Sequence, residues 1–322
     1  MDYLSDLFGT AQQWLFESLV QPLVFGLGFG NLLEDAFDAT GWLLVGLIEI
    51  AVMLIVFRSL ERWRPAEPVA DRQAVRVDVI YTLIHRLGLF RLVMFFSLTP
   101  LWDALSGQLR MAGMPTLQMD ELWPGVTDIA WVSFALYVVL FDFVMYWLHR
   151  GQHGLRWWWA LHSLHHSQRQ MTMWSDNRNH LLDDVLLDSA FVLLARLIGV
   201  PPGQFIALVA VQQLLESLQH ANVRLSFGPI FERVLVSPRF HRVHHSIGVG
   251  HESQGRGTLG GHNFAVLLPI WDVIFRTANF EPRLDATGVR DQLPEEGARD
   301  YGRGFWAQQW LGLKRLLIGS RA

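Results

Sequence analysis

Residues 129–153 read IAWVSFALYVVLFDFVMYWLHRGQH, an apolar run that ends in two histidines four positions apart. The apolar part is long enough to cross a bilayer as a helix, although it contains Asp142. His149 and His153 extend the same helical face, because residues at i and i+4 lie one turn apart. This stretch therefore predicts a membrane helix that carries a pair of imidazoles to one membrane surface.

Further apolar stretches predict a multi-pass membrane protein. Together with 129–148, the candidate spans are 41–57, 79–101, 185–200 and 205–218. The last two are short, and Pro201-Pro202-Gly203 joins them, which predicts a tight hairpin that dips into the bilayer and returns. Residues 14–33 are also apolar, but their pattern does not place them relative to the spans.

The distribution of arginine predicts how these spans are oriented. Residues 1–57 contain no lysine or arginine, the loop at 58–76 contains five arginines, and the loop at 103–127 contains one. By the positive-inside rule, the 58–76 loop is cytoplasmic. Following the chain from there places both histidine-rich stretches on the cytoplasmic face. Three adjacent tryptophans at 157–159 suit the headgroup region of that face.

The overall composition agrees with a membrane protein and excludes several other classes. Of the 322 residues, 51% are hydrophobic and 17% are charged, whereas roughly a quarter of a soluble domain is charged. The net charge of −4 argues against a nucleic-acid partner, which requires a basic face. Because the chain contains no cysteine, it has no disulfide, thiolate metal ligand or cysteine nucleophile.

Nine of the 13 histidines form four groups along the chain. They are His149 and His153; His162, His165 and His166; His220; and His241, His244 and His245. In the HxxxH and HxxHH patterns, imidazoles at i and i+4 share a helical face and can bind the same metal ion. The middle histidine of HxxHH points toward a neighbouring site. Nine imidazoles exceed the roughly six positions of one octahedral ion. The pattern therefore predicts two metal ions, whereas isolated histidines such as His85 and His251 are interpreted as interfacial or hydrogen-bonded.

The number and type of ligands narrow the choice of metal and suggest which residues orient the histidine rings. A structural zinc site closes with four ligands, so nine ligands around two ions indicate a catalytic centre. Among the metals that imidazole suits, iron is favoured because it can change oxidation state and bind dioxygen. Carboxylates and amides should orient the rings. The main candidates for that role are Asp142, Asn179, Asn222 and Asp272, and the weaker ones are Asp176, Asp183 and Asp184.

These motifs resemble the fatty acid hydroxylase superfamily, in particular its sterol desaturase-like branch. The matching text is LHRGQH (148–153), LHSLHH (161–166), RNH (178–180), LQHANV (218–223), SPRFHRVHHS (237–246) and NFAVLLPIWDVIFRT (263–277). The resemblance covers 78–277 as a catalytic domain. It leaves 1–77 as an N-terminal segment with the first span and the arginine-rich loop, and 278–322 as a C-terminal cytosolic tail.

The resemblance implies an all-α fold in which multi-pass transmembrane helices carry a cytosolic helical cap around a di-metal histidine site. It assigns the nine histidines to two iron ions, for which zinc can substitute in a prepared sample, and makes His180 a candidate tenth ligand. The implied activity is O₂-dependent hydroxylation or desaturation of a membrane lipid of sterol or fatty acyl type. Its electrons would come from an external donor of ferredoxin or cytochrome b5 type with a reductase.

The sequence departs from the family pattern at three positions. Arg224 stands where acyl hydroxylases often have a further histidine, which favours the sterol desaturase-like branch. Ala265 and Arg276 stand where the family often has glycine.

A GxGxxG pattern at 255–260 lacks a preceding strand, so it is interpreted as a flexible loop and not as a nucleotide site.

Three other classes of protein remain as alternatives. A membrane zinc-dependent hydrolase would use similar ligands with a carboxylate base, for which Glu252 is the nearest candidate, but the chain has no HExxH motif. A metal transporter would distribute its histidines along a transmembrane path, whereas these are predicted to cluster on one face. A haem-binding electron carrier needs two axial histidines per haem, which would leave most of the nine unexplained.

Overall fold

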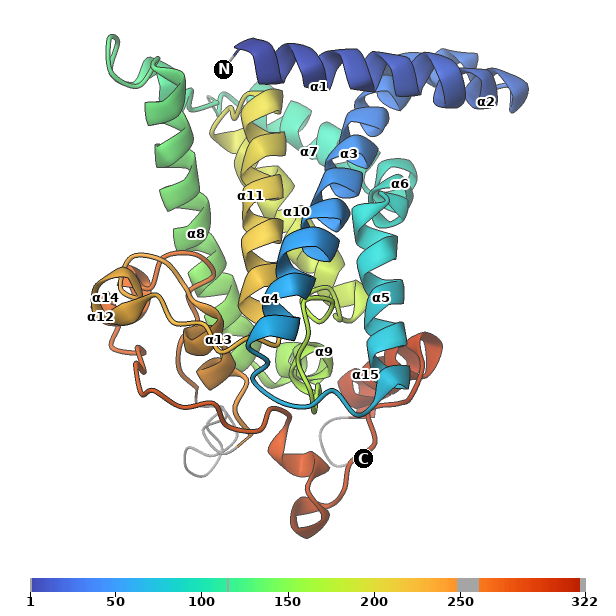
Figure 1. The fold of residues 1–322 in the computed structure, drawn as a ribbon. Coiled ribbons are helices and arrows are strands. Elements are labelled where there is room, and N and C mark those ends of the chain that lie inside the picture. The colour runs from blue at the N-terminus through green and yellow to red at the C-terminus, as the bar shows by residue number, and fades with distance from the viewer. Residues whose placement is uncertain (1, 115, 248–260, 319–322) are drawn as a thin grey trace.

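The computed structural model describes residues 2–114, 116–247 and 261–318. Within these ranges the fold is all helical, without a strand; its only extended pairing is an isolated antiparallel bridge between Ser246 and Thr287. Figure 1 shows long helices side by side, with short helices and loops gathered at one end as a cap. The predicted all-α fold class is therefore confirmed.

Two helical segments are long and apolar enough to cross a membrane. The first, Gly30–Trp63, comprises η2 (Gly30–Leu32), α3 (Leu33–Val52), the π-helical turn η3 (Met53–Phe57) and α4 (Arg58–Trp63). The second is α8, Ala130–Gly154. Both predicted spans are found, and each helix extends beyond its apolar part.

The predicted span at 79–101 is a bent pair of helices and not one continuous helix. α5 (Arg72–Arg86) and α6 (Leu89–Ser97) meet at 50° and qualify as a third span only if taken together. The bend falls at Gly88, whose φ of 77° lies in the left-handed region that favours glycine. α7 (Thr99–Met111) then forms a separate helix, and η4 (Met119–Glu121) follows it.

The expected hairpin is formed by α10 (Leu181–Leu197) and α11 (Pro202–His220). Gly199 turns the chain with a φ of 65°, and Pro202 begins α11, where a missing N–H is tolerated. These two helices run beside α8 inside the bundle (Figure 1). They are shorter or more polar than the two spanning helices and do not qualify as spans themselves.

Residues 14–33, which the sequence pattern did not place, lie at the end of the bundle opposite the cap. α1 (Asp2–Leu15), η1 (Phe16–Val20) and α2 (Gln21–Gly26) form one helical rod across that end (Figure 1). The Gln12 amide donates a hydrogen bond of 2.9 Å to the Phe37 carbonyl and ties the rod to α3.

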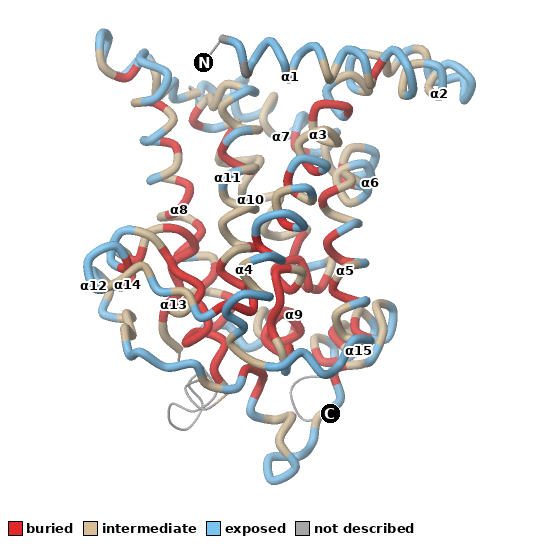
Figure 2. Tube along the Cα trace, in the orientation of Figure 1, coloured by how far each residue is buried: buried red, intermediate tan, exposed pale blue. Residues whose placement is uncertain are grey.

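The cap contains α9 (Arg156–His166), α12 (Gly228–Phe231), α13 (Pro238–His244), α14 (Ile270–Ile274), η5 (Arg290–Gln292), η6 (Pro294–Glu296) and α15 (Phe305–Ile318). Residues 278–318 are packed and do not form a free tail, because α15 lies against α9 and α5. Arg315 Nε donates to the Ala160 carbonyl at 3.1 Å. Figure 2 shows that buried residues concentrate where the cap meets the ends of α8 and α11.

Candidate metal centre

All nine clustered histidines converge at the cap end of the bundle. They come from the ends of α8 and α11 and from α9 and α13, and none is more than 7% exposed. Their ligand atoms form three overlapping groups, each with all atoms within 4.8 Å of one another. The groups are His149, His153, His162 and His166; His165, His220, His241 and His245; and His166, His244 and His245. Two four-histidine groups therefore adjoin, and the third group connects them.

Helical periodicity brings the histidines of each motif together. The ring centroids of His149 and His153 are 5.1 Å apart, and those of His162 and His166 are 5.0 Å apart. His165, the middle histidine of its motif, joins the other four-histidine group, as the spacing predicted. The two distant halves of the chain meet at His166 and His245, whose rings stack at 4.2 Å.

Four rings are oriented by acceptors at Nδ1. The partners are the Phe264 carbonyl for His149 at 2.8 Å, the His262 carbonyl for His244 at 2.7 Å, the Glu216 carbonyl for His220 at 2.9 Å, and the Asp183 carboxylate for His162 at 3.1 Å. A carbonyl or carboxylate oxygen only accepts, so each Nδ1 carries the proton. The lone pair of each ring is therefore on Nε2, the atom that a metal would bind.

The spacing of the Nε2 atoms fits a metal site. The distances are 3.1 Å from His220 to His165, 3.0 Å from His241 to His220 and 3.1 Å from His245 to His241. Two nitrogens bound at right angles to one ion, with bonds of about 2.1 Å, lie about 3.0 Å apart. In the other group, His162 Nε2 is buried with no hydrogen-bond partner among the described residues. Buried imidazole nitrogens in this arrangement are suited to a cation.

The electrostatic environment keeps several of these imidazoles neutral. Burial lowers the pKa of His165, His241 and His245 well below 6.5, and the neighbouring histidines lower it further. Neutral imidazole is the form that binds a metal ion. The centre is therefore ready to bind metal at neutral pH.

Asp183 is the carboxylate that contacts a clustered histidine directly. It is fully buried and accepts hydrogen bonds from Gln152 Nε2 at 2.9 Å, Trp158 Nε1 at 2.6 Å and His162 Nδ1 at 3.1 Å. The sequence placed it only among the weaker candidates. Its role depends on the packing of the start of α10 against α9. No local sequence pattern predicts that packing.

Asp142 and Asp272 act on a loop and not directly on a ring. Asp142 accepts from the backbone of Leu267 and Leu268 at 2.7 and 2.9 Å and from the Trp271 indole at 2.9 Å. Asp272 accepts from the N–H groups of Phe264 and Ala265, each at 2.9 Å. Both carboxylates thereby fix the segment whose Phe264 carbonyl orients His149.

The remaining sequence candidates lie further from the rings. Asn222 accepts from the N–H groups of Ala66 and Glu67 and so anchors the loop after α4. Asn179 donates to the Asp176 carbonyl at 3.4 Å. Asp176 pairs with Arg86 at 3.0 Å, and Asp184 lies 3.3 Å from His85.

His180, the possible tenth ligand, lies outside the three histidine groups found among the described residues. Its Nδ1 accepts from Leu182 N as the N-cap of α10, and its Nε2 contacts the Gln309 carbonyl at 2.9 Å. The ring therefore joins α10 to α15. His251, Glu252 and the 255–260 motif lie outside the described residues.

The three adjacent tryptophans differ in their surroundings. Trp157 is 48% exposed, as expected for a headgroup anchor. Trp158 donates to Asp183, and the Trp159 ring lies 5.2 Å from that of His153. Only one of the three faces outward, because α9 turns the other two toward the histidines.

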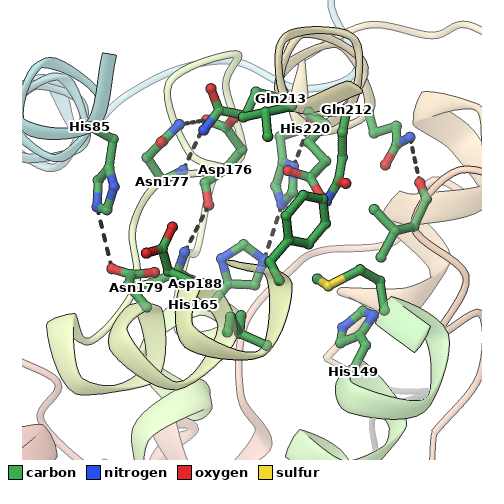
Figure 3. Close-up of a pocket in the computed structure, with 18 of the residues that line it drawn as sticks. His85, His149, His165, Asp176, Asn177, Asn179, Asp188, Gln212, Gln213 and His220 are labelled. Carbon is green, nitrogen blue, oxygen red and sulfur yellow. Dashed lines mark hydrogen bonds and ion pairs between the residues drawn. The ribbon is translucent and has the colours of Figure 1, made fainter. Parts of the chain in front are cut away.

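A cavity of about 210 Å³ extends from the histidines into the helix bundle. It reaches members of both four-histidine groups, including His149 and His220 (Figure 3). α5, α6, α8, α10 and α11 supply most of the other lining residues. A ligand held between the helices could therefore approach the centre without crossing the cap.

Helices that are long and apolar enough to span a membrane, with clustered histidines buried at one end, define a membrane protein with histidine groups able to hold metal ions. Residues 134–277 match the family model described as fatty acid hydroxylase. Together with the relatives below, this match shows that the chain contains a fatty acid hydroxylase domain and is similar to members of that superfamily.

Several characterised proteins are similar to the chain. It is 25% identical to an ornithine lipid hydroxylase of Rhizobium tropici over 249 residues, which cover 77% of this chain and 70% of the relative. It is 31% identical to an alkylglycerol monooxygenase of Danio rerio over 159 residues, 49% of this chain and 32% of the relative. A Delta(7)-sterol-C5(6)-desaturase of Nicotiana tabacum is 26% identical over 129 residues, 37% of this chain and 45% of the relative. The chain thus spans less than half of the last two relatives, and no solved structure matches significantly.

Proposed function

We propose that the protein is an O₂-dependent oxidoreductase that hydroxylates or desaturates a membrane lipid at a centre of two iron ions. The observation that carries the proposal is the closure of nine buried histidines into two adjoining four-histidine groups linked by His244. Relatives named as a lipid hydroxylase, a monooxygenase and a desaturase support the reaction class. We further propose that the histidine end faces the cytoplasm, as the arginine-rich 58–76 loop at the same end indicates.

Bound iron would supply the oxygen activation and electron transfer that the protein side chains lack. The nine histidines would hold it. The oxygen atoms that accept hydrogen bonds from the Nδ1–H groups of His149, His162, His220 and His244 would keep each Nε2 directed at the ions. Because the rings are buried, bulk water would be kept away from the ions that they hold. The cavity between the helices would position the lipid. Electrons would come from a separate ferredoxin or cytochrome b5 type donor with its reductase.

The first test is metal content after anaerobic reconstitution with ferrous iron. We expect about two irons per chain and an O₂-dependent +16 or −2 mass change in a lipid. His165→Ala should abolish that product, whereas His262→Ala should retain it, because only the backbone carbonyl of His262 orients a clustered ring. Full turnover by His165→Ala would contradict the assignment of this residue.

The same experiment separates the alternatives. Stoichiometric zinc, resistance to iron loading and lipid cleavage without O₂ would favour the zinc-dependent hydrolase. A transporter would move the metal across vesicles. The compact histidine groups do not suggest such a path, since all nine rings lie at one end of the bundle.

A further inference from the structure

The C-terminal helix α15 uses one of its faces to hold the cap together. The Gln309 amide donates to the Tyr81 hydroxyl on α5 at 2.9 Å, and its side-chain oxygen accepts from Leu181 N, at the start of α10, at 2.9 Å. Further along α15, Arg315 Nε donates to the Ala160 carbonyl of α9. These contacts with three helices fix which face of α15 points inward.

The outward face of α15 carries large apolar side chains. Trp306, Trp310 and Leu317 are 79%, 64% and 74% exposed. They follow one another at intervals of four and seven residues, so they form one stripe along the helix, which we call the α15 stripe. The outward face of a helix on a water-soluble domain is normally polar. An exposed apolar stripe of this kind therefore indicates contact with an apolar partner.

The α15 stripe has a cationic edge on one side. Lys314, the only lysine of the chain, is exposed and lines a small cavity together with Glu296 and Asp300, so it is turned toward the 291–300 segment. That segment projects from the cap away from the spanning helices (Figure 1). Tryptophan is enriched in the headgroup layer of a bilayer, and a lysine beside it can extend its amine toward water. The pattern is typical of an amphipathic helix that lies in a membrane surface.

The position of α15 makes its stripe continuous with surfaces that face lipid. On one side it packs against α5, which forms a candidate span with α6 and exposes Ile80 directly beside Tyr81. On the other side it packs against α9, which begins directly after the spanning helix α8 ends. There the exposed Trp157 lies about one turn before Ala160. α15 therefore joins the cap-side ends of two candidate spans, and Figure 1 shows it at the foot of α5.

We propose that α15 lies in the bilayer surface on the cap side, with the α15 stripe inserted among phospholipid headgroups. The inference is independent of the proposed reaction, because it uses none of the clustered histidines. It also connects the membrane surface to the metal centre. Gln309 binds the backbone at the start of α10, two residues before Asp183, and Asp183 is the carboxylate that contacts His162.

The absence of cysteine from the sequence allows a direct test, since a single nitroxide label then reports on one chosen position. Trp306→Cys, Trp310→Cys and Leu317→Cys are labelled in the full-length protein and placed in nanodiscs of phosphatidylcholine and phosphatidylglycerol. Electron paramagnetic resonance measures how strongly dissolved oxygen and a water-soluble nickel chelate relax each label. Because oxygen concentrates in lipid, it should relax these three labels more strongly than the chelate does. The control, Glu295→Cys at an exposed position of η6, should show the reverse.

A second measurement covers the case in which a label disturbs α15. Trp310→Glu and Trp310→Leu are compared by hydrogen exchange of the α15 amides in the same nanodiscs. Trp310 is largely exposed in the protein itself, so protein contacts alone predict similar exchange in the two variants. Lipid contact predicts exchange about threefold faster in Trp310→Glu, because a charge is disfavoured even near the bilayer surface.

Three results would overturn the inference. Stronger relaxation by the nickel chelate than by oxygen at all three positions would place the α15 stripe in water. Shielding from both reagents, with broadening between labels that disappears on dilution with unlabelled protein, would show that a second copy of the chain covers the stripe. Equal exchange in Trp310→Glu and Trp310→Leu would show that lipid does not stabilise α15.

Discussion

Asp183→Asn should remove one of the two metal ions and leave the other in place. The substitution retains the shape of Asp183 but replaces one carboxylate oxygen with an NH₂ group. Three donors, on Gln152, Trp158 and His162, then face one remaining acceptor oxygen. If His162 Nδ1 loses its acceptor, the ring can reverse its tautomer and withdraw the Nε2 lone pair from its group.

The magnitude follows from the geometry. Removing a partner that orients a metal-binding histidine typically lowers metal affinity by 10–100-fold, on the order of 1.4–2.7 kcal/mol. Only His149, His153, His162 and His166 form the affected group. His165, His220, His241 and His245 have no hydrogen bond to Asp183, so their ion should remain.

The assay is anaerobic titration with ferrous iron, followed by removal of loosely bound metal and mass-spectrometric metal analysis. At a free ferrous iron concentration just high enough to fill both sites of the unmodified protein, we expect about two ions per chain in that protein and about one in Asp183→Asn. Asp38→Asn, at an exposed position on α3, is the matched control and should bind about two. Unchanged affinity for both ions in Asp183→Asn would refute the argument that Asp183 orients His162.

Four further predictions concern stability and topology. Gly46→Ala should lower the free energy of unfolding by about 3 kcal/mol or prevent folding, because the new Cβ would lie 1.7 Å from the Arg86 carbonyl oxygen. The control is Gly107→Ala, whose Cβ would meet nothing within 4 Å. Equal melting temperatures of the two variants would contradict the close packing of α3 on α5. Arg276→Gly should stabilise the protein by up to about 1 kcal/mol, since Arg276 has a φ of 58° that favours glycine; a lower melting temperature would count against this. The contribution of His165, His241 and His245 to the pH dependence of the metal-free protein should be destabilising as pH falls below 6.5, because their lowered pKa values mean that these residues bind more protons in the unfolded chain. Between pH 7.5 and 5.5 the thermal midpoint should therefore change less unfavourably in His245→Gln than in the unmodified protein, and an equal change in the two would contradict this. Arg72→Cys introduces a lone thiol into a cysteine-free chain, and an impermeant maleimide should label it only after the membrane is opened; labelling of intact cells would place the cap end outside.

Several features of the fold follow from local sequence alone. The apolar runs in α3 and α8 identify two spans, and Pro201-Pro202-Gly203 identifies the turn between α10 and α11. The bend between α5 and α6 was missed, because an isolated Gly88 inside an apolar run does not reveal that its φ will be positive. The packed C-terminal segment was also missed, since Gly312 shows its role only beside His180, whose Cδ2 would lie 2.4 Å from an added Cβ.

The sequence by itself determined which imidazoles can act together within each motif. Helical periodicity places His149 with His153 and His162 with His166 whatever the rest of the chain does. It also determined that these motifs share one end of the bundle, because the number and direction of the apolar runs follow from the chain. The first property depends on short-range helical geometry, and the second depends on the succession of apolar runs along the chain.

The tertiary structure alone decided what surrounds those rings. Asp183 binds His162 because the start of α10 packs on α9, and Phe264 orients His149 because Asp142 and Asp272 hold its loop. Likewise, Asp188 on α10 and Glu216 on α11 line the same cavity only after the two helices pack side by side. Such contacts join residues far apart in the chain, and no local periodicity encodes the packing of one helix against another.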